Sequence, residues 1–274
     1  MNKLYNYYVP KGGLPQQNQK VKDRAIFKNA YLFIPREVLC DIVTSQLPFW
    51  NKTRMWVLSR PMSGFSETFS HYIVEVKSGG GSDHTENDPA AESILFVVEG
   101  TLELNISNKS YKLSKGSYVF LPPSIKWTIF NLDTENACFH WIRKKYSFVE
   151  GINEPNEFVK NENDVQSVNM PESNCMWSTK RFVDTEDMRH DMHVNIVSFK
   201  PGGIIPFLET HVMEHGLYVL QGEGIYNLNQ DKIHVKPGDY MLLRAFCPQS
   251  CEAIGKVPFR YLLYKDVNRH MALK

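Results

Sequence analysis

Short stretches in which apolar residues alternate with polar ones, or run together for a few positions, recur along most of the chain. They are rich in Val, Ile, Tyr and Phe and are separated by turns that contain Gly, Asn, Asp or Lys. This pattern is typical of β-strands, and no long stretch shows the period of a helix. We therefore predict an all-β protein with strands at His71–Val76, Ile94–Val98, Tyr118–Leu121, Val194–Phe199, Tyr218–Leu220, Tyr240–Leu243 and Tyr261–Tyr264.

The chain also contains an internal repeat. The segment LFVVEGTLELNISNKSYKLSKGSYVFLPP in the first half matches LYVLQGEGIYNLNQDKIHVKPGDYMLLRA in the second. In each copy a strand ends at a glycine, Gly100 or Gly222, and a second glycine follows 16 residues later, at Gly116 or Gly238. Two similar β units in tandem predict two small barrels or double-sheet jelly rolls, a group that includes the cupins.

The repeat also suggests domain boundaries. Residues 1–25 are irregular and are expected to form an N-terminal arm, and residues 26–148 are assigned to the first barrel. Residues 149–180 are polar and poor in strand patterns, so we interpret them as a linker. Residues 181–274 are assigned to the second barrel.

Composition narrows the possible partners. The formal net charge is +1, so no strong field favours nucleic acid or a membrane surface. The only tight basic cluster, Arg143–Lys145, is interpreted as a solvated strand end. No signal peptide is recognisable, and apolar runs such as Ile94–Val98 are too short to span a bilayer. The five cysteines lack paired spacing, which favours free thiols and a cytoplasmic location.

Candidate metal ligands occur in the second copy. Glu209 and His211 are two residues apart, so in a strand they share a face, and His215 follows four residues later. Gln249 lies beyond the strand Tyr240–Leu243, which can lie beside the first strand in a barrel. A single barrel histidine is more often packed than metal-bound, but two imidazoles with oxygen donors form a site for Mn²⁺, Fe²⁺, Co²⁺ or Ni²⁺.

The spacing around these residues resembles the cupin motifs. Gly203, Glu209-x-His211, His215 and Gly222 keep the intervals of the first motif, with Glu and His exchanged. This Glu/His/His/Gln set resembles the (S)-ureidoglycine aminohydrolase family, bicupin enzymes of purine (allantoin) catabolism. Four further segments are similar to that family: YYVPKGGLPQQ, DIVTSQLPFWNKTR, SRPMSGFSETFSHYIVEV and YLLYKDVNR.

The resemblance implies one Mn²⁺ per chain, held by Glu209, His211, His215 and Gln249. It also implies hydrolysis of (S)-ureidoglycine to (S)-ureidoglycolate and ammonia, with Glu209, Gln249, Tyr261 and Lys265 binding this small-molecule substrate. Glu209 is the candidate for catalytic proton transfer, although it could serve as a ligand only. We add two expectations, that Tyr226 lines the pocket and that the chain forms a homo-oligomer.

The first copy differs at the ligand positions. Aligned on Gly100 and Gly116, its residues at these four positions are Asn87, Pro89, Ser93 and Trp127, which do not form a metal set. The first barrel is therefore expected to retain the scaffold without the site, with its neighbouring His84, Glu86 and Glu92 as surface residues.

Two other functions remain open at this point. One is a different metal-dependent cupin enzyme, such as an iron dioxygenase or an isomerase, because cupin folds support many reactions. The other is a bicupin that binds a ligand without catalysis.

Overall fold

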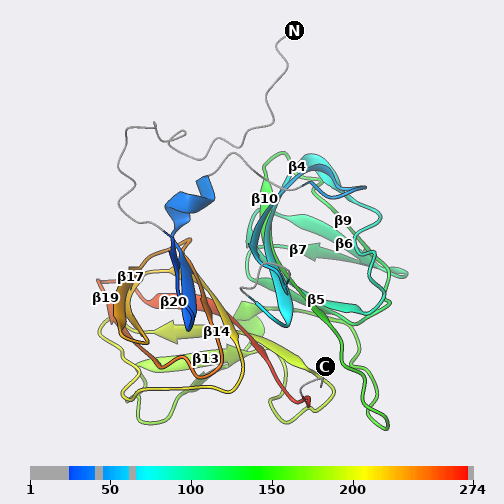
Figure 1. The fold of residues 1–274 in the computed structure, drawn as a ribbon. Helices are drawn as coiled ribbons and strands as arrows, with labels where there is room; N and C mark the ends of the chain where they lie inside the picture. Colours follow the sequence, from blue (N-terminus) through cyan, green and yellow to red (C-terminus); the bar gives the residue numbers. More distant parts are fainter. Residues whose placement is uncertain (1–24, 41–45, 62–65, 271–274) are drawn as a thin grey trace.

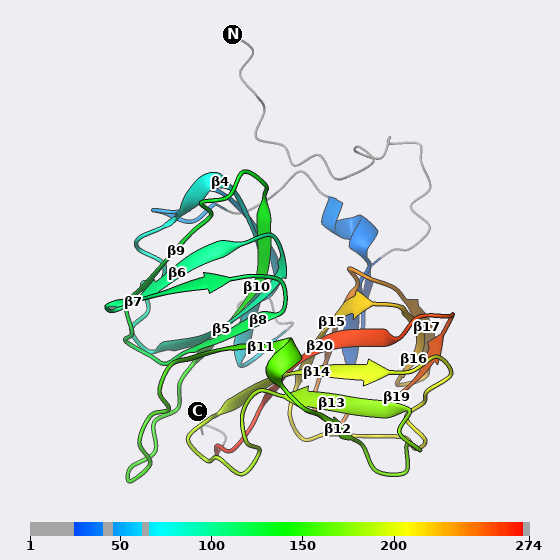
Figure 2. The same ribbon diagram turned by 180° about the vertical axis from the view of Figure 1, so that it is seen from behind.

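The computed structural model describes residues 25–40, 46–61 and 66–270, which form two β barrels side by side (Figures 1 and 2). The helical segments that lie fully within these ranges are the short 3₁₀ turns η1 and η3. The all-β bicupin prediction is confirmed. The predicted N-terminal arm, residues 1–25, falls almost entirely outside the described residues.

The first barrel is a nine-stranded sheet in the order β11-β8-β5-β10-β4-β9-β6-β7, with β3 paired to β4. Its elements are β3 (Asn51–Ser59), β4 (Phe69–Ser82), β5 (Ala91–Glu99), β6 (Leu102–Ile106), β7 (Lys109–Leu113), β8 (Ser117–Leu121), β9 (Trp127–Phe130), β10 (Ala137–Lys145) and β11 (Phe158–Asn161).

The second barrel combines an eight-stranded sheet, in the order β1-β2-β18-β15-β20-β14-β13-β12, with a three-stranded sheet, β17-β16-β19. Its elements are β1 (Ile26–Phe27), β2 (Tyr31–Ile34), η1 (Arg36–Cys40), η3 (Glu162–Asp164), β12 (Ser167–Asn169), β13 (Trp177–Arg181), β14 (Met192–Phe199), β15 (His215–Gln221), β16 (Glu223–Leu228), β17 (Asp231–Val235), β18 (Tyr240–Leu243), β19 (Gln249–Ile254) and β20 (Phe259–Asp266).

The structure moves two of the predicted boundaries. Residues 26–34 belong to the second barrel, because β2 pairs antiparallel with β18; in Figure 1 this blue hairpin lies against the second barrel. The predicted linker, residues 149–180, contains strands of both barrels. Strand β11 extends the first sheet through β8, and β12 and most of β13 belong to the second sheet.

The two barrels share a hydrophobic interface. The first barrel contributes Phe69 and Tyr118, and the second contributes Phe182 and Tyr264. The rings of Phe69 and Tyr264 stack with centroids 3.7 Å apart, and those of Tyr118 and Phe182 with centroids 3.9 Å apart. Burial of such aromatic faces is a large favourable contribution to packing, so the barrels are held together by a continuous core.

Three sequence expectations about charged residues are wrong. Glu92 is fully buried rather than on the surface. Lys144, expected at a solvated strand end, is buried and pairs with Asp191 of the second barrel at 2.6 Å. Arg143 forms an ion pair with Glu86 at the rim of the first barrel. In each case the partner is distant in sequence, so no local pattern indicates the burial.

Candidate active site in the second barrel

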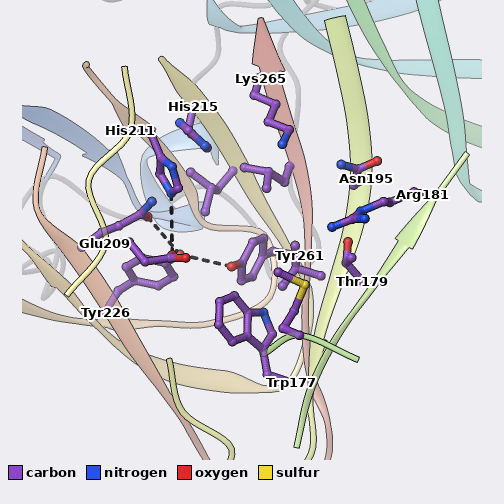
Figure 3. Close-up of a pocket in the computed structure, with 15 residues that line it drawn as sticks. Trp177, Thr179, Arg181, Asn195, Glu209, His211, His215, Tyr226, Tyr261 and Lys265 are labelled. Carbon is purple, nitrogen blue, oxygen red and sulfur yellow. Dashed lines mark hydrogen bonds and ion pairs between the residues drawn. The ribbon is translucent and has the colours of Figure 1, made fainter. Parts of the chain in front are cut away.

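A cavity of about 100 Å³ opens inside the second barrel, and all the residues that the sequence assigned to the site line it. These are Glu209, His211, His215, Gln249, Tyr226, Tyr261 and Lys265. Figure 3 shows Glu209, His211 and His215 on one side of this pocket and Lys265 at its upper edge. The structure therefore brings the predicted residues together in one place.

The backbone that positions Glu209 and His211 differs from the strand that we expected. Glu209 forms an isolated bridge with Gln249, with reciprocal N–H to O contacts of 2.8 Å, and regular strand begins only at His215. The Phe246 amide donates to the carbonyl of His211 at 2.6 Å. Glu209 and His211 are therefore positioned by a loop that pairs with the start of β19, and not by the continuous strand that the sequence predicted.

Three of the four candidate donors lie near one another. His211 Nε2 lies 3.7 Å from Glu209 Oε2, and the rings of His211 and His215 have centroids 4.6 Å apart. His215 Nδ1 lies 3.2 Å from the Met213 carbonyl. Since a carbonyl only accepts, Nδ1 carries the hydrogen and Nε2 keeps a free lone pair, which is the arrangement of a metal-bound histidine.

Burial, with a smaller contribution from His211, lowers the pKa of His215 to about 3, so its ring is neutral at physiological pH. A neutral imidazole is the form that binds a metal. Within the described ranges, no three His, Cys, Asp or Glu side chains alone are close enough to hold a metal ion. The donor types of Glu209, His211, His215 and Gln249, which line one pocket, nevertheless suit a metal ion.

Two tyrosines form the floor of the pocket. Tyr226 donates its hydroxyl hydrogen to Tyr261 at 3.2 Å and approaches Gln249 Oε1 at 3.4 Å. Burial raises the pKa of both hydroxyls well above the ordinary value, so both remain protonated donors. The pKa of Lys265 is lowered, first by burial and then by the nearby positive charge of Arg181.

Sequence reasoning missed one wall of the pocket. Trp177, Thr179 and Arg181 line it from alternate positions of β13, and Asn195 lines it from β14. The alternation of side chains from Trp177 to Arg181 could have predicted a strand with one face toward the pocket. We missed it because we assigned residues up to 180 to a linker. Arg181 and Asn195 are cross-strand partners.

The first barrel has a cavity at the equivalent place. It is lined by Asn87, Pro89, Ser93 and Trp127, the four residues aligned with the candidate ligands. Trp127 is buried, and its ring lies edge-on to Trp141, with centroids 5.7 Å apart. These four side chains do not form a metal donor set.

Fold and site together define a bicupin with one candidate metal centre. A model of the cupin domain matches residues 72–143 and 195–264, one match in each barrel. More distant structural neighbours include an oxalate decarboxylase at 13% identity with a TM-score of 0.64, which shows the fold alone.

Closer relatives define the family. The chain is 30% identical to (S)-ureidoglycine aminohydrolase of Escherichia coli, over 92% of this chain and 94% of that protein. It is 31% identical to the enzyme of that name from Arabidopsis thaliana, over 90% and 79% of the two chains. The chain therefore belongs to the (S)-ureidoglycine aminohydrolase family and is an enzyme.

Two solved structures are similar to this chain over nearly its whole length. A Pseudomonas aeruginosa protein, provisionally named as glyoxylate-induced, is 56% identical over 98% of both chains with a TM-score of 0.91. Protein Ylba of E. coli is 28% identical over 92% and 97% of the two chains, with a TM-score of 0.80. In the part of the chain that the structure describes, no helix is long and apolar enough to cross a membrane.

Proposed function

We propose that this enzyme hydrolyses (S)-2-ureidoglycine to (S)-ureidoglycolate and ammonia in a Mn²⁺-dependent reaction of allantoin degradation. The observation that supports this most directly is the convergence of Glu209, His211, His215 and Gln249 with Lys265 in one small pocket. A pocket of this size, with few charged groups, suits a small polar metabolite. Relatives at about 30% identity are named for the reaction.

The metal would be held by Glu209, His211, His215 and Gln249. Two imidazole nitrogens with carboxylate and amide oxygens suit Mn²⁺, which prefers harder donors than zinc structural sites provide. When bound, the ion would act as a Lewis acid that polarises the substrate and lowers the pKa of water. The choice of manganese over iron, cobalt or nickel rests on the family resemblance.

The remaining pocket residues bind and orient the substrate. The Lys265 ammonium pairs with the substrate carboxylate as a point charge. Tyr261 donates a hydrogen bond to a carboxylate or ureido oxygen, and Tyr226 holds the Tyr261 hydroxyl in place. Glu209 takes a proton from the attacking water and passes it to the amine, so that the C–O bond forms, the C–N bond breaks and ammonia leaves. Fixing one face of the carbon makes the attack stereospecific.

The test is ammonia release from freshly prepared ureidoglycine, with the chirality of the ureidoglycolate product measured in the same reaction. The protein loaded with Mn²⁺ is expected to release ammonia and yield the S product, and Glu209→Gln is expected to lower the rate at least about 100-fold. A matched control is Asn87→Ala, at the equivalent position of the first barrel, which should keep the full rate. No ammonia release from the Mn²⁺-loaded protein would refute the proposal.

A further inference from the structure

The wall of the pocket formed by β13 and β14 contains polar groups without partners. Asn195 is only 4% exposed, and its Oδ1 accepts no hydrogen bond. Trp177 is 5% exposed, and its Nε1 donates none. A buried polar atom that lacks a partner costs about 1–3 kcal/mol. Both residues line the pocket, so a polar ligand bound there can supply the missing partners.

Two cationic side chains, Arg181 and Lys265, also line this pocket. Within the described ranges, neither the Arg181 guanidinium nor the Lys265 ammonium forms a hydrogen bond or ion pair. Figure 3 shows Arg181 across the pocket from Glu209 and His211, and Lys265 at the upper edge of the pocket. Two neighbouring positive charges repel each other. Their placement therefore favours a ligand that offers an acceptor oxygen to each of them.

The strand register places Arg181 and Lys265 opposite different residues of β14. Arg181 on β13 lies directly opposite Asn195 on β14, whereas Lys265 on β20 lies opposite His193, two positions along β14. Side chains of directly opposed residues start about 5 Å apart at Cβ. Arg181 and Asn195 therefore present a hydrogen-bond donor and an unpartnered acceptor side by side, and Lys265 stands apart from them.

A donor beside an acceptor is complementary to one edge of a terminal carbamoyl group, which presents a carbonyl oxygen beside an N–H. We propose that Arg181 and Asn195 form the subsite that recognises the carbamoyl end of the substrate. Arg181 donates to the carbonyl oxygen, and Asn195 Oδ1 accepts from the terminal NH₂ group. Lys265 is left to bind the carboxylate at the other end.

This assignment rests on the proposed function for the identity of the substrate, and it adds a basis for specificity. A site built to pair with an N–H rejects an analogue that lacks it, because its own buried acceptor is then left without a partner. Binding of the carboxylate alone would not distinguish ureidoglycine from other small acids. The two residues on β13 and β14 provide that discrimination.

The experiment measures binding of three stable probes to the full-length, Mn²⁺-loaded protein by titration calorimetry. N-carbamoylglycine has both the carboxylate and the terminal carbamoyl group, N-acetylglycine replaces the terminal NH₂ with methyl, and glycolate has no carbonyl arm. The wild type is expected to bind N-carbamoylglycine about tenfold more tightly than N-acetylglycine.

Substitution of the subsite should remove this preference and nothing else. Asn195→Leu and Arg181→Met are expected to bring the ratio of the two affinities to within about twofold while the Kd of glycolate stays unchanged. Asn195→Asp, which keeps an acceptor, should retain the preference even if the Leu variant folds poorly. Lys265→Met should weaken all three probes. Ser178→Ala, a β13 variant outside the pocket lining, serves as the control.

The results separate this inference from the proposed function. An unchanged ratio in both subsite variants, or an equal loss for all three probes, would overturn the assignment of Arg181 and Asn195. Ammonia release by a wild-type protein that shows no carbamoyl preference would overturn the subsite and leave the function standing. A carbamoyl preference that depends on Asn195, without ammonia release, would refute the function and leave the subsite standing.

Discussion

Replacement of Lys144 by Met tests the ion pair that joins the two barrels. Lys144 Nζ lies 2.6 Å from Asp191 Oδ2, with the two side chains 8% and 0% exposed. The amide of Ser147 also donates to Asp191 Oδ2, at 2.8 Å. Burial would raise the pKa of Asp191, but the neighbouring Glu92 carboxyl and Lys144 ammonium outweigh it and keep the pKa below the ordinary value. Asp191 is therefore a buried carboxylate anion that depends on Lys144.

Removal of one partner of a buried pair leaves an uncompensated charge, which costs about 3–5 kcal/mol. In a chain of this size each kcal/mol lowers Tm by roughly 2–4 °C, so Lys144→Met is expected to lower Tm by about 6–20 °C. Thermal unfolding followed by circular dichroism measures this change. Lys145→Met, the exposed neighbour, is the matched control and should change stability by less than about 0.5 kcal/mol.

Replacement of both partners shows whether the stability lost in Lys144→Met comes from the unpaired charge or from packing. The double variant Lys144→Met, Asp191→Asn removes both charges, so it should recover a large part of the stability that Lys144→Met loses. A single variant that loses less than about 1 kcal/mol would refute the reasoning, because Asp191 would then not depend on Lys144. A double variant no more stable than the single one would show that the loss comes from packing.

Three further predictions follow from individual contacts. His215→Ala should abolish stoichiometric Mn²⁺ binding, measured by metal analysis after dialysis, and chelation of the wild type should stop ammonia release until Mn²⁺ is returned. Burial, and then the neighbouring Asp191 carboxylate, raises the pKa of Glu92 well above the ordinary value, so its proton stabilises the fold below about pH 4.5 and this contribution is lost as pH rises toward the folded-state pKa. Glu92→Gln should therefore match the wild type near pH 4.5 and become more stable by about 1.4 kcal/mol per pH unit above it; urea unfolding at several pH values would show a constant difference if this is incorrect. In Gly216→Ala the new Cβ would lie 2.7 Å from the ring of Phe69, so unfolding should become easier by about 1–3 kcal/mol, whereas an unchanged midpoint would mean that the barrels separate freely to accommodate a methyl group.

The sequence predicts the repeated framework well because backbone constraints are local. Gly100 and Gly222, the matched glycines of the two copies, have φ angles of +73° and +69°. Gly116 and Gly238 likewise have φ angles of +84° and +96°. L-residues with a side chain rarely adopt this region, so each glycine marks the same turn. Strand β18 occupies the predicted residues, Tyr240–Leu243.

Features that depend on distant partners could not be predicted in the same way. The segment Tyr31–Ile34 is apolar and looks like any buried strand, but its partner, β18, is about 200 residues away in the other barrel. Burial of Glu92 and Lys144 depends on Asp191. The internal repeat does not indicate that Asp191 lies near either of them. The Arg181–Asn195 wall was missed because the register of β13 on β14 decides which side chains meet.

The contacts between the barrels indicate what the first barrel contributes, although its own cavity has no metal donor set. Glu214, which precedes the candidate ligand His215, is buried, and its carboxylate accepts hydrogen bonds from the amides of Glu67 at 2.9 Å and Thr68 at 2.7 Å. The Thr68 hydroxyl also donates to Glu214. Because these donors belong to the first barrel, they fix the backbone at the start of β15, where the loop with Glu209 and His211 ends. Loss of the first site is therefore compatible with retention of its scaffold, since the second site depends on that scaffold for its position.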